Sequence, residues 1–83
     1  MSEGKKIGKV THYYSKIGVA VVELEADLKV GDEIVIKGAH TDVEQVVDSM
    51  QMEHENINVA HKGMAIGLKV GDTVHEGSIV FKM

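Results

Sequence analysis

The sequence contains no cysteine, no proline and no tryptophan among its 83 residues. The lack of cysteine excludes disulfides and thiolate metal sites and is typical of a reducing compartment, so we expect a cytoplasmic protein. Aromatic residues make up only 4 % of the chain, so aliphatic side chains must fill the interior. Hydrophobic residues reach 43 %, and the length suits one domain.

Long apolar runs and an excess of positive charge are missing too. No segment approaches the roughly 18 uncharged apolar residues that span a bilayer, and the start lacks the apolar run of a signal peptide. We therefore expect no membrane partner. The net charge of −4 argues against a surface that attracts a nucleic-acid backbone as a whole, and DNA is not an expected partner. A local basic patch stays open.

Regularly spaced glycines and many β-branched residues predict short strands. In the first of these, residues 6–14, alternation places Val10, His12 and Tyr14 on one face. A turn at Ser15 and Lys16 follows, and residues 17–24 are apolar on both faces, as in a strand inside a barrel. Further strands are expected at 33–37, after Thr41 as the second arm of a hairpin, at 63–70 and at 78–82.

Residues 43–53 fit two patterns. Valines and a methionine at i, i+3, i+4 and i+7 favour an amphipathic helix locally, whereas the alternation of residues 44–52 fits a strand less cleanly. The neighbouring strands recur every 8–12 residues or so, which is typical of an all-β barrel. We therefore predict a strand with a bulge. The pentapeptide LKVGD occurs at 28–32 and 68–72, but a pairing of Gly31 with Gly77, each opening a strand, is structurally more plausible.

Four segments in this order resemble the second domain of translational GTPases such as elongation factor Tu: residues 7–10, 28–34, 60–68 and 77–80. The similarity runs from Ile7 to Lys82 and implies a six- or seven-stranded Greek-key β-barrel over residues 6–83, with residues 1–5 as a flexible N-terminus. It also implies a translation- or RNA-linked binding module, with transfer RNA, ribosomal RNA or a ribonucleoprotein as partner. No G-x-x-x-x-G-K-[ST] loop is present, which excludes nucleotide hydrolysis.

The chain also resembles stand-alone elongation-factor-like small proteins and the C-terminal barrel of collagenase-like peptidases, through residues 12–14, 41–45 and 49–50. This second similarity implies an alternative function: an accessory protein-binding subunit that acts in trans on a peptidase-like or RNA-modifying enzyme. A monomer or a weak dimer is expected.

No catalytic, cofactor or metal site is predicted. The serines Ser15, Ser49 and Ser78 lie at predicted turns or on a strand surface without a positioned base, so we expect no enzyme activity. The five histidines lack the short paired spacings of zinc ligands; His54 and His61, with the glutamates beside His54, form the weaker metal alternative.

A partner-binding surface is predicted instead around two adjacent tyrosines. Neighbouring residues of a strand face opposite ways, so Tyr13 and Tyr14 cannot both be buried and at least one ring is exposed. An exposed aromatic ring beside lysines can stack on a base or fill a partner's pocket. The alternative is that both rings only cover the barrel. The predicted surface comprises His12, Tyr13, Tyr14, Lys16, His61 and Lys62.

Overall fold

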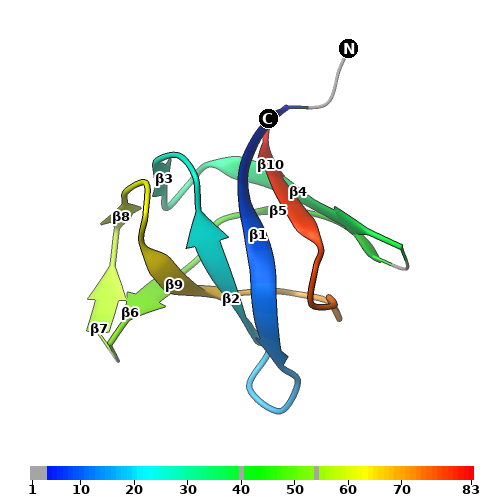
Figure 1. The fold of residues 1–83 in the computed structure, drawn as a ribbon. Helices are drawn as coiled ribbons and strands as arrows, with labels where there is room; N and C mark the ends of the chain where they lie inside the picture. The colour runs from blue at the N-terminus through cyan, green and yellow to red at the C-terminus, as the bar shows by residue number, and fades with distance from the viewer. Residues whose placement is uncertain (1–3, 40, 54) are drawn as a thin grey trace.

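The computed structural model describes residues 4–39, 41–53 and 55–83. All regular elements in these residues are strands, which confirms the all-β prediction. A helix long and apolar enough to cross a bilayer is absent from the described part of the chain. The strands are β1 (Lys5–Tyr14), β2 (Val19–Leu24), β3 (Leu28–Lys29), β4 (Glu33–Gly38), β5 (Thr41–Val46), β6 (Met50–Met52), β7 (Glu55–Ile57), β8 (Val59–Ala60), β9 (Ala65–Lys69) and β10 (Ile79–Lys82) (Figure 1).

Eight strands form one antiparallel sheet in the order β5-β4-β10-β1-β2-β9-β6-β7, and β3 pairs with β8 separately. Within the described residues β5 and β7 remain the two edges of the sheet and do not pair with each other. The prediction of a closed six- or seven-stranded Greek-key barrel is therefore wrong. Of the predicted flexible N-terminus, residues 1–3 lie outside the described residues, while Lys5 begins β1 opposite Lys82.

The sheet stays open because the chain changes partner between β5 and β6. After Val46 the backbone leaves β4: the Val47 amide donates to the Asp32 carbonyl (2.8 Å), and the Val47 carbonyl accepts from the Gly31 amide (2.9 Å). The chain then crosses to β6, which pairs with β9. Residues 43–46 and 50–52 are strands, which confirms the choice of strand over helix, but a crossing separates the two strands, and no bulged single strand closes the sheet.

One side chain bridges the gap that the backbone leaves. The Gln45 amide nitrogen donates to the Lys69 carbonyl (2.9 Å), and its oxygen accepts from the Gly71 amide (3.0 Å). An amide group offers the same donor and acceptor as a peptide unit, so Gln45 replaces a ladder contact between β5 and the end of β9.

The core lies inside the curved sheet and is aliphatic, as the composition predicts. Strands β1–β4, β6, β8, β9 and β10 contribute buried residues to it, while Val43 of β5 and Ile57 of β7 are partly buried and pack against it. The side chains with no exposed surface are Val10, Ala20, Val22, Ile36, Met50, Ala60, Leu68 and Val80. Burying such side chains is the main source of stability in a domain this small.

A bulge in β1 changes which residues face this core. The register of β1 against β2 shifts between Val10 and His12, so Thr11 is an extra residue. After it the alternation is reversed: Tyr13 packs against the core, while His12 and Tyr14 are exposed. The prediction that Val10 and Tyr14 share a face is therefore wrong, because a bulge shifts the alternation by one residue.

Candidate protein-interaction surfaces

The turn between β1 and β2, residues 14–18, forms the hairpin tip. It lies at the end of the molecule away from the start of β1 and the end of β10 (Figure 1). Gly18 has φ = 67°, a left-handed conformation that favours glycine, and its amide donates to the Tyr14 carbonyl (2.9 Å). The Gly18 carbonyl accepts from the Val70 amide (2.9 Å), so the tip is tied to the segment after β9. The tip and the end of β1 carry four of the predicted residues: His12, Tyr13, Tyr14 and Lys16.

Apolar surface is exposed at the hairpin tip. Tyr14 is 49 % exposed and Ile17 62 % exposed, while Tyr13 is half-buried, so the expectation of one exposed tyrosine ring is confirmed. The His12 ring meets Tyr14 edge to face, with centroids 4.3 Å apart, and its Nδ1 lies 3.1 Å from Glu76 Oε2. These contacts limit the rotamers of Tyr14 and leave its ring facing solvent.

Ile17 is a member of this surface that the sequence analysis missed. It was assigned to a buried strand over residues 17–24, but β2 begins only at Val19. The left-handed Gly18 completes the turn, which places Ile17 before the strand and in solvent. The available sequence signal was Gly18, which directly follows Ile17 and the predicted turn at Ser15 and Lys16.

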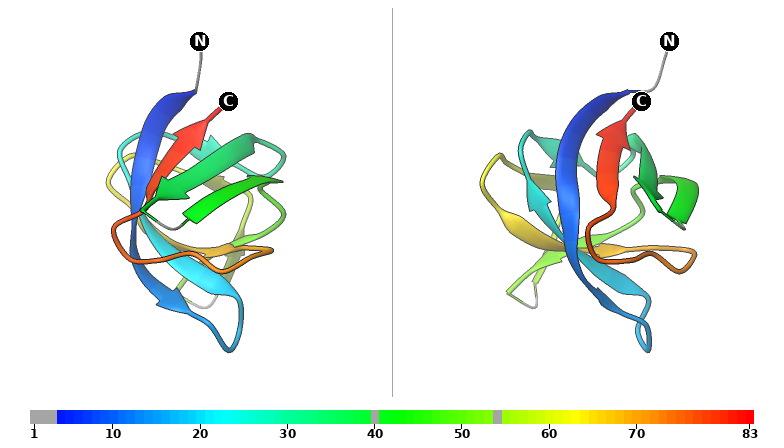
Figure 2. Two further views of the ribbon diagram at one scale, coloured as in Figure 1. Left: turned by 90° about the vertical axis from the view of Figure 1, so that its right-hand side faces the viewer. Right: turned by 45° about the vertical axis from the view of Figure 1, so that its right-hand side comes forward.

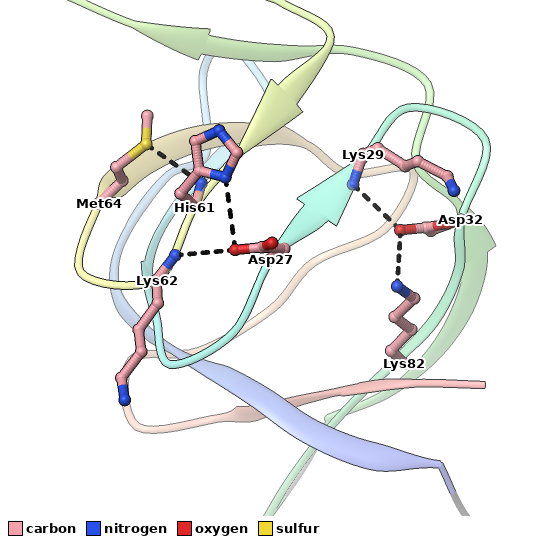
Figure 3. Close-up of polar contacts among 7 residues, drawn as sticks. All are labelled: Asp27, Lys29, Asp32, His61, Lys62, Met64 and Lys82. Carbon is pink, nitrogen blue, oxygen red and sulfur yellow. Dashed lines mark hydrogen bonds and ion pairs between the residues drawn. The ribbon is translucent and has the colours of Figure 1, made fainter.

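His61 and Lys62 lie elsewhere, in the turn before β9 (Figure 3). Asp27 Oδ1 is 3.4 Å from His61 Nδ1 and 3.3 Å from the Lys62 amide, and the His61 amide donates to Met64 Sδ (3.1 Å). The next residue, Gly63, pairs with Leu24, at the end of β2 farthest from the hairpin tip. Five strand residues span roughly 16 Å, so the six predicted residues form two separate groups.

A third surface, which we call the outer face, lies on β10, β4 and β5, on the side of the sheet opposite the core. Figure 2 (left) shows these strands side by side with β1. Their registers align the outward residues in three rows. The rows are Ile79, Lys37 and Asp42; Phe81, Val35 and Glu44; and Met83, Glu33 and Val46.

The outward direction of these residues follows from strand alternation. Ile34, Ile36 and Val80 belong to the core cluster, so their neighbours along each strand point away from it. Val35 is only 5 % exposed yet does not belong to that cluster; its cross-strand neighbours are Phe81 and Glu44. Val46 and Met83 are 50 % and 59 % exposed. Both line a depression on this side of the sheet, together with residues 33–35, 44 and 45.

The outer face was also missed by the sequence analysis, although a signal was present. Residues 34–36 and 79–81 are each three consecutive apolar residues. In a sheet with one face in water, every second residue of a strand is expected to be polar. A strand that is apolar on both faces predicts that other residues pack against both faces. That argument was applied only to residues 17–24.

The histidines do not assemble into a metal site in the described part of the chain, where no three His, Asp or Glu side chains converge. His12 and His61 are each beside one carboxylate, and His75 Nδ1 lies 2.8 Å from Thr41 Oγ1. His40 and His54, and with His54 the weaker metal alternative, lie outside the described residues.

Comparison with known proteins connects this fold to peptidases. No family model matches the chain. An uncharacterised protease of Methanocaldococcus jannaschii is 46 % identical over 77 residues, which cover 92 % of this chain and 19 % of the protease. A collagenase of Porphyromonas gingivalis is 36 % identical over 78 residues, 92 % of this chain and 22 % of the collagenase. The chain thus spans about a fifth of the length of these curated relatives.

A solved structure shows the same fold. The C-terminal domain of a Geobacillus thermoleovorans protein named as a U32 peptidase superposes with a TM-score of 0.88, covering 95 % of this chain and 92 % of that one at 22 % identity. The chain therefore has the fold of a U32-peptidase C-terminal domain and resembles this domain of the U32 peptidase and collagenase proteins.

These findings correct the functional prediction. The translation- or RNA-linked function is wrong, because the relatives are a protease, a collagenase and a U32 peptidase, and none of them supports transfer RNA, ribosomal RNA or a ribonucleoprotein as a partner. The resemblance to elongation factor Tu is not supported, whereas the resemblance to collagenase-like peptidases is confirmed. The alternative function, linked to a peptidase, fits the comparisons better.

Proposed function

We propose that this chain is a non-catalytic accessory domain that binds a U32-type peptidase in trans. The observation that carries the proposal is the 46 % identity to a protease of which the chain matches only 19 %. The remaining four-fifths of such a protein have ample length for a separate catalytic body. The peptide-bond chemistry belongs, in this proposal, to that body.

The interior of the domain supports a binding role. Aliphatic side chains fill it, and the buried polar or charged residues of the described chain are Thr41 and Ser78 alone. Among the large exposed apolar side chains of the described residues, Tyr14 and Ile17 lie at the hairpin tip and Val46 and Met83 on the outer face, while Val30 and Val59 lie at the β3–β8 end. Exposed apolar patches rimmed by polar residues mark protein–protein contacts. The predicted partner-binding role of His12, Tyr13, Tyr14 and Lys16 is part of this proposal.

The proposal is tested with the M. jannaschii protease from which the segment aligned to this chain is deleted, here called the truncated protease. We expect this chain to bind the truncated protease in calorimetric titration. The excised protease segment, supplied as a separate domain, serves as the positive control. If the excised segment binds and this chain does not, the proposed function is wrong.

A further inference from the structure

We propose that the outer face is the surface on which the catalytic body of the peptidase docks. This inference rests on the proposed function and names the surface and the chemistry of its partner. Five of the nine residues in the three rows are apolar, and they include the only phenylalanine of the chain. They lie on three neighbouring strands whose backbones are fixed by pairing on at least one side.

Four of the five apolar residues of the outer face adjoin one another. Ile79 and Phe81 follow one another along β10, Met83 comes directly after that strand opposite Glu33, and Val35 lies beside Phe81. Val46 lies on β5 opposite Glu33, at the edge of the sheet. Strands with apolar residues on both sides are those covered on both sides. The core covers one side of β4 and β10, and a partner is needed to cover the other.

The position of the chain ends favours the catalytic body as this partner. Lys5 pairs with Lys82, so the start of β1 and the end of β10 lie side by side next to the Met83 row of the outer face (Figure 1). In the Geobacillus relative the same fold is the C-terminal domain, so the rest of that protein joins it at the start of β1. A catalytic body joined at the start of β1 is closer to the outer face than to the hairpin tip. The hairpin tip is at the other end of β1.

Charges around the apolar patch define the partner surface further. Lys9 and Lys6 of β1 stand opposite Ile79 and Phe81 and border the patch on its β1 side, whereas Lys37 of β4 lies between Ile79 and Asp42. Carboxylates border the opposite side, on β5 and at the end of β4. A complementary surface therefore has an apolar centre, acidic groups toward β1 and basic groups toward β5, which also determines the orientation of docking.

The size of the outer face suits the centre of an interface. Three rows on three strands cover about 14 Å by 10 Å between backbone positions, and on the order of 300 Å² with side chains included. A standard interface buries about 800 Å² on each partner, with an apolar centre inside a polar rim. The outer face thus supplies the centre, and the surrounding polar residues supply the rim.

The test introduces two charges into the outer face and compares them with two charges elsewhere. The face variant is Val46→Glu with Met83→Glu, and the matched control is Val30→Glu with Val59→Glu, since these valines are 38 % and 48 % exposed and lie at the β3–β8 end. All four side chains are exposed, so folding is retained, and circular dichroism checks it. Each variant is titrated into the truncated protease.

We expect the face variant to bind at least about 100-fold more weakly than the native chain, and the control within about 3-fold of it. If the native chain and the face variant bind equally, the outer face is not the docking surface although the proposed function stands. If the native chain does not bind at all, both the proposed function and the proposed docking surface are wrong. A dimer of the chain alone that the face variant dissociates would identify a second copy as the occupant and overturn the inference.

Discussion

The hairpin tip and the outer face both expose apolar side chains, but they hold them differently. At the hairpin tip, Tyr14 and Ile17 project from a turn, with His12 as the side-chain support of the tyrosine. On the outer face, five apolar residues project from three strands in a hydrogen-bonded register. A preorganised surface loses less conformational entropy on binding, so equal apolar area contributes more affinity there.

This difference shows that exposure alone does not identify the principal binding surface. The most exposed side chains on the hairpin tip are more accessible than Phe81, which is only partly exposed. Residues that dominate binding are, however, usually central and well packed, with exposed neighbours around them. We therefore expect the outer face to dominate affinity and the hairpin tip to make a smaller contribution.

Among substitutions that only remove side-chain atoms, the largest effect is expected from Phe81→Ala. Phe81 lies in the middle row of the outer face, and truncation of a central aromatic residue costs about 2–4 kcal/mol of binding free energy. Affinity for the truncated protease should fall by about 30-fold or more. Thermal unfolding of the isolated variant serves as the control for folding. If the folded variant binds with unchanged affinity, the outer face is not the surface that dominates binding.

The next effect is expected at the hairpin tip, from Tyr14→Ser combined with Ile17→Ser. Loss of two exposed apolar side chains should weaken binding by about 10-fold, or 1.4 kcal/mol, with the thermal midpoint unchanged. The matched control is Val30→Ser with Val59→Ser. A loss larger than that of Phe81→Ala would reverse the ranking of the two surfaces.

Gln45→Ala tests whether the Gln45 side chain stabilises β5, the edge strand of the outer face. Its amide makes two hydrogen bonds, to Lys69 and Gly71, and their loss should cost about 1 kcal/mol of stability. Hydrogen exchange should accelerate in residues 41–46 and stay unchanged in residues 19–24. Gln51→Ala removes an amide that, within the described part of the chain, donates to the Asn56 side chain (3.3 Å), and serves as the control. Equal exchange in both variants would show that Gln45 does not hold the open edge.

The smallest effect is expected from His61→Ala combined with Lys62→Ala. This turn lies at the far end of β2 from the hairpin tip, and its side chains extend from the β3–β8 end of the domain. Affinity for the truncated protease should stay within about 2-fold of the native value, because exposed single charges contribute little. A loss comparable with that at the hairpin tip would restore the single surface predicted from the sequence.

Much of the strand content could be predicted because the signals are local. Gly31 and Gly77 are two such signals: both have positive φ, 98° and 90°, and each precedes a strand by two residues, β4 and β10. The paired LKVGD segments were less informative. Val30 is 38 % exposed and Val70 only 5 %, so the same five residues have different surroundings.

The rest depended on interactions that a local pattern does not contain. The bulge at Thr11 reverses the alternation of β1 only because β2 pairs on both sides of it. The open sheet depends on the crossing at Val47 and on the Gln45 bridge, which joins residues 24 to 26 positions apart. His61 and Lys62 are separated from Tyr14 because Tyr14 pairs with the start of β2, whereas the turn that holds His61 and Lys62 contacts its end.

The most direct test is an NMR titration of the labelled 83-residue chain with the truncated protease. The account predicts that amide resonances of residues 33–37, 42–46 and 79–83 shift most, those of residues 13–18 less, and those of residues 59–64 not at all. Shifts concentrated in residues 59–64, or a titration that leaves residues 79–83 unchanged while others move, would contradict it.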